Sequence, residues 1–342
     1  MGRLPNASIT LRRVEHLADK MIIESFPPRL PEPIRALYPF RTRYLLVDER
    51  PAAGNSATGE MMSFVDEGPE TAPPLLLLHG NLTWSFLYRD LIARARGRFR
   101  VIAPDLLGFG LSSKPRDPAW FTLERYGEHL SQLVSELRLG KLTLVLHDWA
   151  GPIGFRYTMA CPENVSRIVL VNSWPDARVA GFADHLPLWL AAARNRWAAS
   201  LLRAWTPTPW PSLAWATAKP LEPAVEEAYR YPFRLPVNRT APLALARLMR
   251  PARESQLEAF ESLKPELKKI RAKVQILWGE GDPLFRGKLL PYLLRDSLPN
   301  CGEPVFVSGA SHLLPEDAPE LLADKVLETA RGRQAEPIFK IL

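Results

Sequence analysis

Short apolar runs and amphipathic segments alternate along most of the chain. Residues 74–78 form a continuous aliphatic run, as expected of a strand that is covered on both faces. The pattern predicts strands at residues 43–48, 61–66, 74–78, 99–104, 141–146, 166–171, 274–278 and 304–307, and helices at residues 85–96, 123–137, 150–159, 288–294 and 319–330. This alternation predicts an α/β fold, with a mostly parallel sheet and helices on both of its faces.

The alternation stops at residues 174–263. Five of the ten tryptophans gather there among many prolines and no strand pattern: Trp189, Trp197, Trp205, Trp210 and Trp215. We interpret this block as a helical cap inserted between two parts of a core, residues 35–173 and 264–342. Such a cap would enclose an apolar cavity, because open α/β sheets bind ligands at the carboxyl ends of their strands. Residues 1–34 are expected to form an N-terminal amphipathic extension that ends in a proline-broken linker.

The stretch from Leu144 to Gly151 has the layout of a nucleophile elbow, in which a strand, a sharp turn and a helix follow one another. An apolar run ends at Asp148, and Ala150 and Gly151 are small enough for the next helix to pack close to the strand. Asp148 would then be the nucleophile, where acyl hydrolases carry serine. The alternative is that Asp148 only caps the following helix.

Two later positions are candidate partners of this carboxylate. His312 follows the last predicted strand, which agrees with the nucleophile–acid–histidine order of elbow enzymes. Asp282 follows the preceding strand and could orient His312 and stabilise its imidazolium, with Glu280 as a rival for this role. The alternatives are a structural loop histidine and an Asp-Pro turn.

The loop after residues 74–78 supplies a third candidate group. Gly80 lets the backbone turn, and the backbone N–H groups of Asn81 and Trp149 are expected to point to where an oxyanion would form. The Asn81 amide and the Trp149 indole are neutral donors that could also hold a small anion in an apolar pocket. Asn81 could instead serve only a tight turn.

Three motifs together resemble the haloalkane dehalogenases of the α/β-hydrolase superfamily. They are His79-Gly80-Asn81-Leu82-Thr83-Trp84-Ser85, Asp105-Leu106-Leu107-Gly108-Phe109-Gly110-Leu111-Ser112 and His147-Asp148-Trp149-Ala150-Gly151. The resemblance extends over about residues 38–330. It implies an α/β-hydrolase fold with an inserted helical cap, Asp148 as the nucleophile and His312 as the base. It also implies Asn81 and Trp149 as halide ligands.

The resemblance also bears on the catalytic acid. One branch of the family carries a glutamate just after the strand before the cap, where this chain has Asn172. The role therefore goes to Asp282, which resembles the third dehalogenase branch. That branch also holds β-lactone decarboxylases of bacterial olefin biosynthesis.

Two positions depart from the family. Leu82 stands where proline is usual, so we expect a less rigid loop around Asn81 and weaker anion binding. Ala150 replaces the usual glycine and adds one methyl group at the elbow. Leu146, where epoxide hydrolases and esterases tend to carry glycine, agrees with the dehalogenases.

The implied reaction is hydrolysis of a carbon–halogen bond through an alkyl ester on Asp148, giving alcohol and halide without a metal or organic cofactor. A carboxylate suits this displacement because it is already anionic. One alternative is a β-lactone decarboxylase that forms olefins, and another is an epoxide hydrolase, which would need two cap tyrosines as proton donors. Tyr229 and Tyr231 lie in the cap, but a spacing of two does not bring side chains together on a helix. A catalytically silent binding protein is the non-enzymatic alternative.

The net charge of +7 is concentrated in the cap, where residues 194–253 hold nine arginines and one lysine against three glutamates. We interpret this region as a solvated helical surface whose arginine stems cover apolar ground. The alternative is contact between the basic cap and a membrane surface or an acidic protein. Nucleic acid is not expected as a partner, because no nucleic-acid motif accompanies the charge.

Composition adds little about the site itself. Cys161 and Cys301 fit a reducing compartment and offer no metal cluster. Because we find no secretory signal and no membrane-spanning apolar window, we expect a cytoplasmic protein. Its expected partners are a small apolar halogenated substrate and the halide ion, and the sequence gives no prediction of the oligomeric state.

Overall fold

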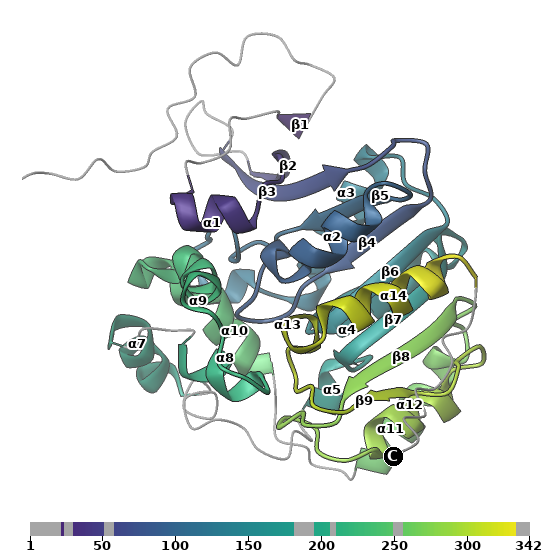
Figure 1. Cartoon of the computed structure of the whole chain (residues 1–342). Helices are drawn as coiled ribbons and strands as arrows, with labels where there is room; N and C mark the ends of the chain where they lie inside the picture. The colour runs from purple at the N-terminus through teal and green to yellow at the C-terminus, as the bar shows by residue number, and fades with distance from the viewer. Residues whose placement is uncertain are drawn as a thin grey trace, which may run out of the picture.

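The computed structural model describes residues 22–23, 30–50, 58–180, 195–205, 210–248 and 256–332. Their strands form one nine-stranded sheet in the order β1-β2-β3-β5-β4-β6-β7-β8-β9 (Figure 1). The strands are β1 (Ile22–Ile23), β2 (Thr42–Arg50), β3 (Thr58–Glu67), β4 (Pro74–Leu78), β5 (Arg100–Pro104), β6 (Leu142–Asp148), β7 (Val165–Ser173), β8 (Lys273–Gly279) and β9 (Val305–Val307). The pairings among β4 to β9 are parallel and those of β1, β2 and β3 are antiparallel, so the predicted mostly parallel sheet is confirmed.

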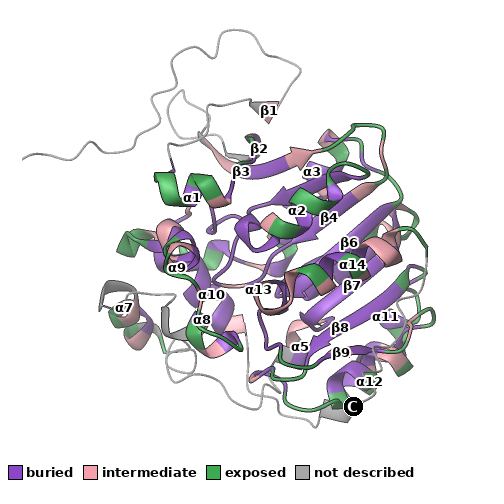
Figure 2. Ribbon diagram, in the orientation of Figure 1, coloured by how far each residue is buried: buried purple, intermediate pink, exposed green. Residues whose placement is uncertain are grey.

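Helices cover both faces of this sheet, as predicted. The core helices are α1 (Glu32–Leu37), η1 (Ser85–Tyr88), α2 (Arg89–Ala95), η2 (Pro118–Trp120), α3 (Leu123–Glu136), α4 (Ala150–Ala160), η3 (Pro162–Asn164), α11 (Gln256–Leu267), α12 (Leu289–Ser297), α13 (Leu314–Asp317) and α14 (Pro319–Ala330). Successive strand residues face opposite sides. Leu76 and Leu78 of β4 therefore pack with residues of α3 and α4, and Leu75 and Leu77 pack with residues of α2 and α14. Figure 2 shows the buried strands between helices whose outer faces are exposed.

Two strands run further than the apolar pattern predicts. β6 continues through His147 to Asp148, and β7 continues to Ser173. The parallel register explains this, because His147 pairs with Val171 and Asp148 pairs with Ser173. Backbone hydrogen bonds carry the ladder, so it continues where the side chains become polar.

The segment between β7 and β8 contains only helices in its described part. Its elements are α5 (Ala177–Ala180), α7 (Arg196–Trp205), α8 (Trp210–Ala216), α9 (Pro223–Arg230), η4 (Tyr231–Phe233), η5 (Pro236–Arg239) and α10 (Thr240–Leu248), which we call the cap, and then α11. The expected end of the cap at residue 263 falls inside α11, whose Phe260 and Leu263 belong to the core cluster on the α3 and α4 side. No helix in the described residues is long and apolar enough to cross a bilayer.

The N-terminal extension is described only in part, and most of its predicted helix lies outside the described residues. Ile22 and Ile23 pair with Leu45 and Tyr44 as a short edge strand. Helix α1 begins inside the stretch expected to be a linker. Pro31 is its N-cap residue and Pro33 lies in its first turn, where the backbone nitrogen has no acceptor within the helix and proline is tolerated.

Candidate active site

Asp148 ends strand β6 in a sharp turn. Its φ of +53° is a left-handed conformation that costs a non-glycine residue roughly 1–2 kcal/mol. The neighbouring strand supports the turn, because Ser173 Oγ donates a hydrogen bond of 2.5 Å to the Asp148 carbonyl oxygen. At Gly151, in the first turn of α4, a Cβ would lie 2.1 Å from the Trp174 carbonyl oxygen, so only glycine fits. These contacts give Asp148 the geometry of a nucleophile elbow.

The structure brings His312 and Asp282 together beside this carboxylate. His312 Nε2 lies 3.6 Å from Asp148 Oδ1, and His312 Nδ1 donates a 3.0 Å hydrogen bond to Asp282 Oδ2. All three side chains are buried. The imidazole therefore connects two carboxylates that come from the ends of different strands.

Electrostatics in this group favour a charged imidazole in the free protein. Burial alone would lower the pKa of His312, but the Asp282 charge and the contacts with Asp148 outweigh it and raise that pKa from 6.5 to about 10. Burial alone would raise the pKa of Asp282, yet the His312 charge and the hydrogen bonds that the carboxylate accepts keep it below its usual value. The free protein thus holds an imidazolium between two carboxylates.

Asn172 positions Asp282, a role that we did not predict from the sequence. Its Nδ2 donates to Asp282 Oδ2 at 2.8 Å, and its Oδ1 accepts from the Gly279 N–H at 3.0 Å. Its φ of +41° is one that asparagine tolerates better than most residues. The sequence feature that could have indicated this role is a polar residue directly after the apolar run at residues 166–171. Asp148 likewise follows an apolar run.

Glu280, the rival for the acid role, lies elsewhere. Its carboxylate is 3.4 Å from Lys288 Nζ, and its side chain is 39% exposed. In the structure, Asp282 is therefore the carboxylate that forms a hydrogen bond with His312, and Glu280 is not.

The loop after β4 holds the second carboxylate oxygen of Asp148. The Asn81 N–H donates to Asp148 Oδ2 at 2.6 Å. A Cβ at Gly80 would lie 2.4 Å from the same oxygen, so residue 80 must lack a side chain. The two oxygens of Asp148 are thus unequal, because Oδ2 is bound by a backbone donor and Oδ1 faces His312.

Leu82 differs from the expectation of a looser loop. Its φ is +63°, and its N–H donates to Asn81 Oδ1 at 2.9 Å. Proline could neither adopt this φ nor donate this hydrogen bond. Asn81 Nδ2 in turn donates to the Pro242 carbonyl oxygen of α10 at 3.3 Å, so the carboxamide is held from both ends.

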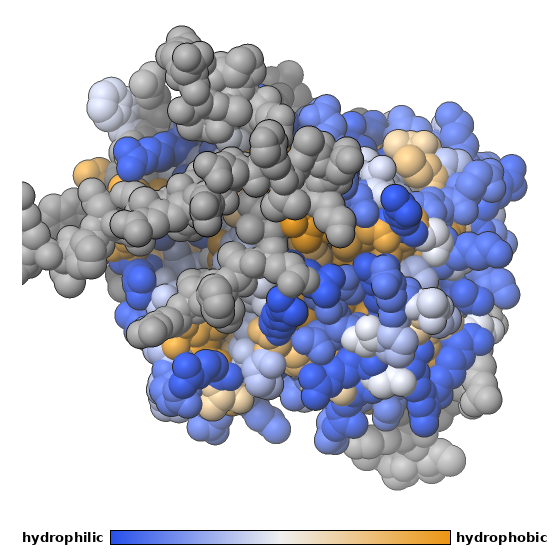
Figure 3. Space-filling view, turned by 90° about the horizontal axis from the view of Figure 1, so that it is seen from above, coloured by the Kyte–Doolittle hydropathy of each residue, from blue (hydrophilic) through white to orange (hydrophobic). Residues whose placement is uncertain are grey.

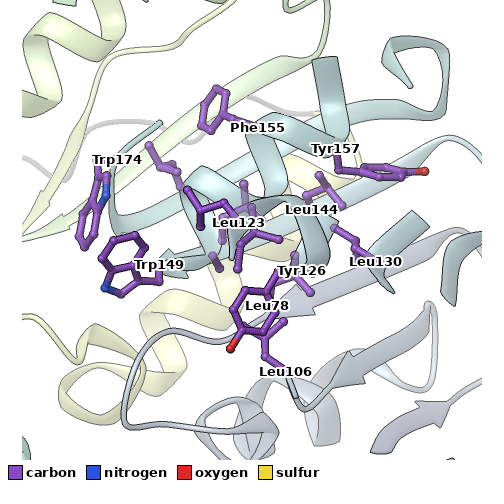
Figure 4. Packing of buried hydrophobic residues seen from close by; sticks show 14 of the residues in the cluster. Leu78, Leu106, Leu123, Tyr126, Leu130, Leu144, Trp149, Phe155, Tyr157 and Trp174 are labelled. Atoms are coloured by element: carbon purple, nitrogen blue, oxygen red, sulfur yellow. The ribbon is translucent and has the colours of Figure 1, made fainter. Parts of the chain in front are cut away.

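Trp149 keeps its donors available. Its ring is buried and packs edge-on against Trp174, with ring centroids 5.7 Å apart (Figure 4). Within the described chain, neither its backbone N–H nor its indole Nε1–H has a hydrogen-bond acceptor. As far as the described residues show, both groups could donate to a ligand.

Two neutral histidines fix the backbone of the site. His147 Nε2–H donates to the His312 carbonyl oxygen at 2.9 Å, and burial together with the nearby His312 charge lowers the pKa of His147 to about 4. His79 accepts from the Leu106 N–H at 2.9 Å, so its other ring nitrogen donates to the Gly80 carbonyl oxygen at 2.8 Å. Burial lowers the pKa of His79 as well. Neither role was predicted.

The two cap tyrosines do not face the site together. The Tyr229 hydroxyl donates to Glu316, which also forms a two-point ion pair with Arg89 at 2.5 and 2.8 Å. Tyr231 instead lies under the Arg234 guanidinium, 4.3 Å from its ring centroid. In the described residues, no group of three or more His, Cys, Asp or Glu side chains could hold a metal ion.

Comparisons with known proteins agree with this geometry. The family model described as alpha/beta hydrolase fold matches residues 73–319. A haloalkane dehalogenase from Mycobacterium marinum is 31% identical over 85% of this chain and 94% of its own length. A cis-3-alkyl-4-alkyloxetan-2-one decarboxylase from Shewanella oneidensis is 28% identical over 84% of this chain and 87% of its own. The crystal structure of a haloalkane dehalogenase from Bradyrhizobium elkani has a TM-score of 0.71 and 23% identity, over 81% of this chain and 96% of that one.

Proposed function

Because this chain belongs to the α/β-hydrolase fold family and has haloalkane dehalogenases among its relatives, we propose that it is a haloalkane dehalogenase. One observation carries the proposal. The Asp148 carboxylate has Oδ2 bound by the Asn81 N–H at 2.6 Å and Oδ1 placed 3.6 Å from His312 Nε2. A carboxylate held this way can form a bond to carbon through Oδ1, and its Oδ2 can carry the negative charge of an oxyanion when the resulting ester is hydrolysed.

In the first step, Asp148 Oδ1 attacks the sp³ carbon that carries the halogen. The carbon–oxygen bond forms as the carbon–halogen bond breaks, and the halide leaves with the bonding electrons. No base is needed, because the carboxylate is already anionic. The indole N–H of Trp149 and the second amide hydrogen of Asn81 donate hydrogen bonds to the leaving halide and stabilise its developing negative charge. Such hydrogen bonds stabilise charge more strongly in a buried site than in water.

In the second step, His312 activates water against the ester. Alkylation removes the negative charge of Asp148, one of the groups that raise the pKa of His312, so this pKa falls when a base is required. Neutral Nε2 takes a proton from water, whose oxygen attacks the ester carbonyl carbon. Asp148 Oδ2 becomes the oxyanion, bound by the N–H groups of Asn81 and Trp149. Collapse releases the alcohol, and the proton leaves to solvent.

Asp282 supports the second step through the ring. Its carboxylate accepts the Nδ1–H of His312 and therefore fixes the tautomer in which Nε2 faces the ester. It also supplies the negative charge that stabilises the imidazolium. Asn172 holds this carboxylate in place.

The β-lactone decarboxylase is a second candidate, which two observations favour. The Shewanella relative matches most of both chains, and the Asn81 amide is already partly engaged by Pro242 rather than fully free for a halide. In that reaction, the Asp148 carboxylate would attack the ring carbon bonded to the ring oxygen and break that carbon–oxygen bond. Loss of the freed carboxylate as carbon dioxide would then break the new bond to Asp148, leaving an olefin and the regenerated Asp148 carboxylate.

The epoxide hydrolase alternative has less support. It needs tyrosine hydroxyls that protonate the opening ring oxygen, but the buried Tyr229 donates to Glu316. An epoxide hydrolase also occurs among the similar solved structures, at 21% identity, and this likeness concerns the fold alone.

The two leading candidates are separated by their products. Purified protein should release bromide from 1-bromohexane or 1,2-dibromoethane, and His312→Phe should accumulate an alkyl ester on Asp148, because the first step does not use the imidazole. Intact-protein mass spectrometry would detect the added alkyl group, and peptide mapping would locate it.

The control is Asp148→Ala, which should form no adduct. Olefin and carbon dioxide from a cis-3,4-dialkyl-oxetan-2-one, with no halide from any haloalkane, would assign the decarboxylase instead. An adduct-free His312→Phe variant that still lacks turnover would contradict the ester intermediate.

A further inference from the structure

Helix α7 has an apolar face that points away from the molecule. Trp197 is 74% exposed and Leu201, one turn later, is 63% exposed, whereas Ala199 on the other side is buried. A helix on the surface of a soluble domain usually directs polar residues to solvent. The exposed face of α7 therefore carries apolar residues where the folding of a soluble domain would favour polar ones.

The neighbouring element extends this apolar surface. Leu235 and Val237, at η5, are 53% and 47% exposed, and η5 contacts α7. We call these four side chains (Trp197, Leu201, Leu235 and Val237) the cap patch. Figure 1 shows α7 at the outer edge of the molecule, away from the sheet. Much of the coloured surface in Figure 3 is hydrophilic, with smaller apolar areas between the hydrophilic ones.

The sequence around the cap patch is basic. The sequence has no acidic residue from 185 to 221 or from 228 to 253, and α7 carries Arg196 and Arg203. Next to Leu235, the exposed Arg234 lies over the Tyr231 ring. An apolar surface beside the exposed Arg234, in a part of the sequence that is rich in arginine, suits a partner that is apolar inside and anionic at its surface.

We propose that the cap patch docks the protein onto anionic phospholipid membranes. A helix lying in the headgroup region buries tryptophan and leucine while its arginines meet lipid phosphates. Tryptophan is suited to this place because its ring is apolar and its N–H is polar. The patch projects from one helix and a short turn, and such a shape can enter a fluid bilayer without a complementary protein groove.

Docking does not depend on the reaction assigned to Asp148. If the proposed function holds, docking would also bring the cap close to apolar substrates dissolved in lipid. Membrane binding can be measured without substrate, so failure of either proposal leaves the other testable.

The test is co-sedimentation of the full chain with vesicles of phosphatidylcholine, with and without phosphatidylglycerol. We expect binding to the anionic vesicles that weakens with added salt. Trp197→Gln/Leu201→Gln should lower the partition coefficient about tenfold or more, since most of the exposed apolar area is lost. Arg234→Gln should lower it by about fivefold. Trp197→Phe should retain most of the binding.

A matched control lies on the core. Leu289 of α12 is 59% exposed, comparable to Leu201, but lies outside the cap. Leu289→Gln should bind vesicles like the wild type, and thermal melting should show that every variant is folded. The proposal would be overturned if the double cap variant bound anionic vesicles as well as the wild type does. It would also be overturned if the wild type did not bind anionic vesicles at low salt. A wild-type dimer that the double variant cannot form, without vesicle binding, would assign the patch to self-association. Salt-sensitive binding to polyglutamate but not to vesicles would assign it to an acidic protein.

Discussion

Replacing Asp282 with asparagine should halt the proposed reaction after its first step. The Asp282 carboxylate is buried and accepts hydrogen bonds from four donors: His312 Nδ1, Asn172 Nδ2 and the N–H groups of Leu284 and Phe285. Asparagine keeps the shape, but its NH₂ group replaces one of the two oxygens and must then face the two donors that this oxygen accepted from. Attack by Asp148 on the haloalkane uses none of these contacts and should persist.

The size of the effect follows from the charge on the ring. Burial opposes the charged form of His312, and the Asp282 charge is the leading contribution that nevertheless raises its pKa to about 10. Without that charge, the imidazolium formed when His312 deprotonates water is buried without its counter-ion. Loss of one partner of a buried ion pair costs roughly 3–5 kcal/mol. We therefore expect the second step to slow by about 10²- to 10⁴-fold, and the first step to change by less than about tenfold.

Rapid-mixing kinetics would measure both steps. Asp282→Asn should release a burst of bromide equal to the enzyme concentration, followed by very slow turnover, while mass spectrometry shows the ester. Glu280→Gln is the matched control and should behave like the wild type, because Glu280 contacts Lys288 and is exposed. Undiminished turnover, or equal slowing of both steps, would refute the assigned role of Asp282.

The same variant has a signature in stability. Because the pKa of His312 in the folded protein is about 10 and its ordinary value is 6.5, protonation stabilises the fold fully below pH 6.5, and this contribution is lost as the pH rises to about 10. The free energy of unfolding, measured with urea, should therefore fall across that interval in the wild type. In Asp282→Asn the slope should be shallower, and parallel curves would contradict the assignment.

Three further variants test the surrounding contacts. Leu82→Pro removes the backbone N–H that holds the Asn81 side-chain amide. Its affinity for bromide, measured by calorimetry, should therefore be about tenfold lower than that of Leu82→Ala. Equal bromide affinities of the two variants would show that this hydrogen bond does not support halide binding. Trp149→Phe removes a free indole donor and should weaken bromide binding by about tenfold, whereas unchanged binding would remove Trp149 from the halide site. Glu316→Gln removes the buried carboxylate that pairs with the largely buried Arg89 and leaves only the half-exposed Asp90, 3.7 Å away, so urea unfolding should show a loss of up to about 3 kcal/mol. A loss below about 1 kcal/mol would show that the pair contributes little.

The sheet and the elbow were predictable because their signals are local. Continuous apolar runs mark strands that are covered on both faces, and the small residue Gly151 marks the close approach of α4 to the strand. Spacing alone does not separate Asp282 from Glu280, because both lie in one turn, and the prediction of Asp282 as the acid came from the family resemblance. The hydrogen bond from Asn172 to Asp282 was not predictable, because the two residues are far apart in sequence and meet only in the folded chain.

Other features could not be predicted from the sequence, because they have no sequence pattern or run against the usual preference of the residue. Leucine rarely adopts a positive φ, so nothing at Leu82 predicts its left-handed backbone or its hydrogen bond to Asn81. No role was predicted for His147, which directly follows the strand predicted at residues 141–146, and its hydrogen bond to the His312 carbonyl oxygen joins residues 165 positions apart. Helix α11 runs from Gln256 to Leu267 and so continues through the cap boundary expected at residue 263.

The cap is attached to the core at the loops that carry the proposed base and halide donor. The residue after His312, Leu313, donates its N–H to the Ala216 carbonyl oxygen of α8 at 2.8 Å, and Asn81 Nδ2 donates to Pro242 of α10 at 3.3 Å. A substitution that moves α8 or α10 is therefore expected to shift one of the proposed reacting groups. Placement errors of about 1 Å at reacting groups can cost about 10²-fold in rate. Cap substitutions should thus alter the rates of both steps, and not only substrate affinity, which makes the cap part of the catalytic geometry rather than a passive cover.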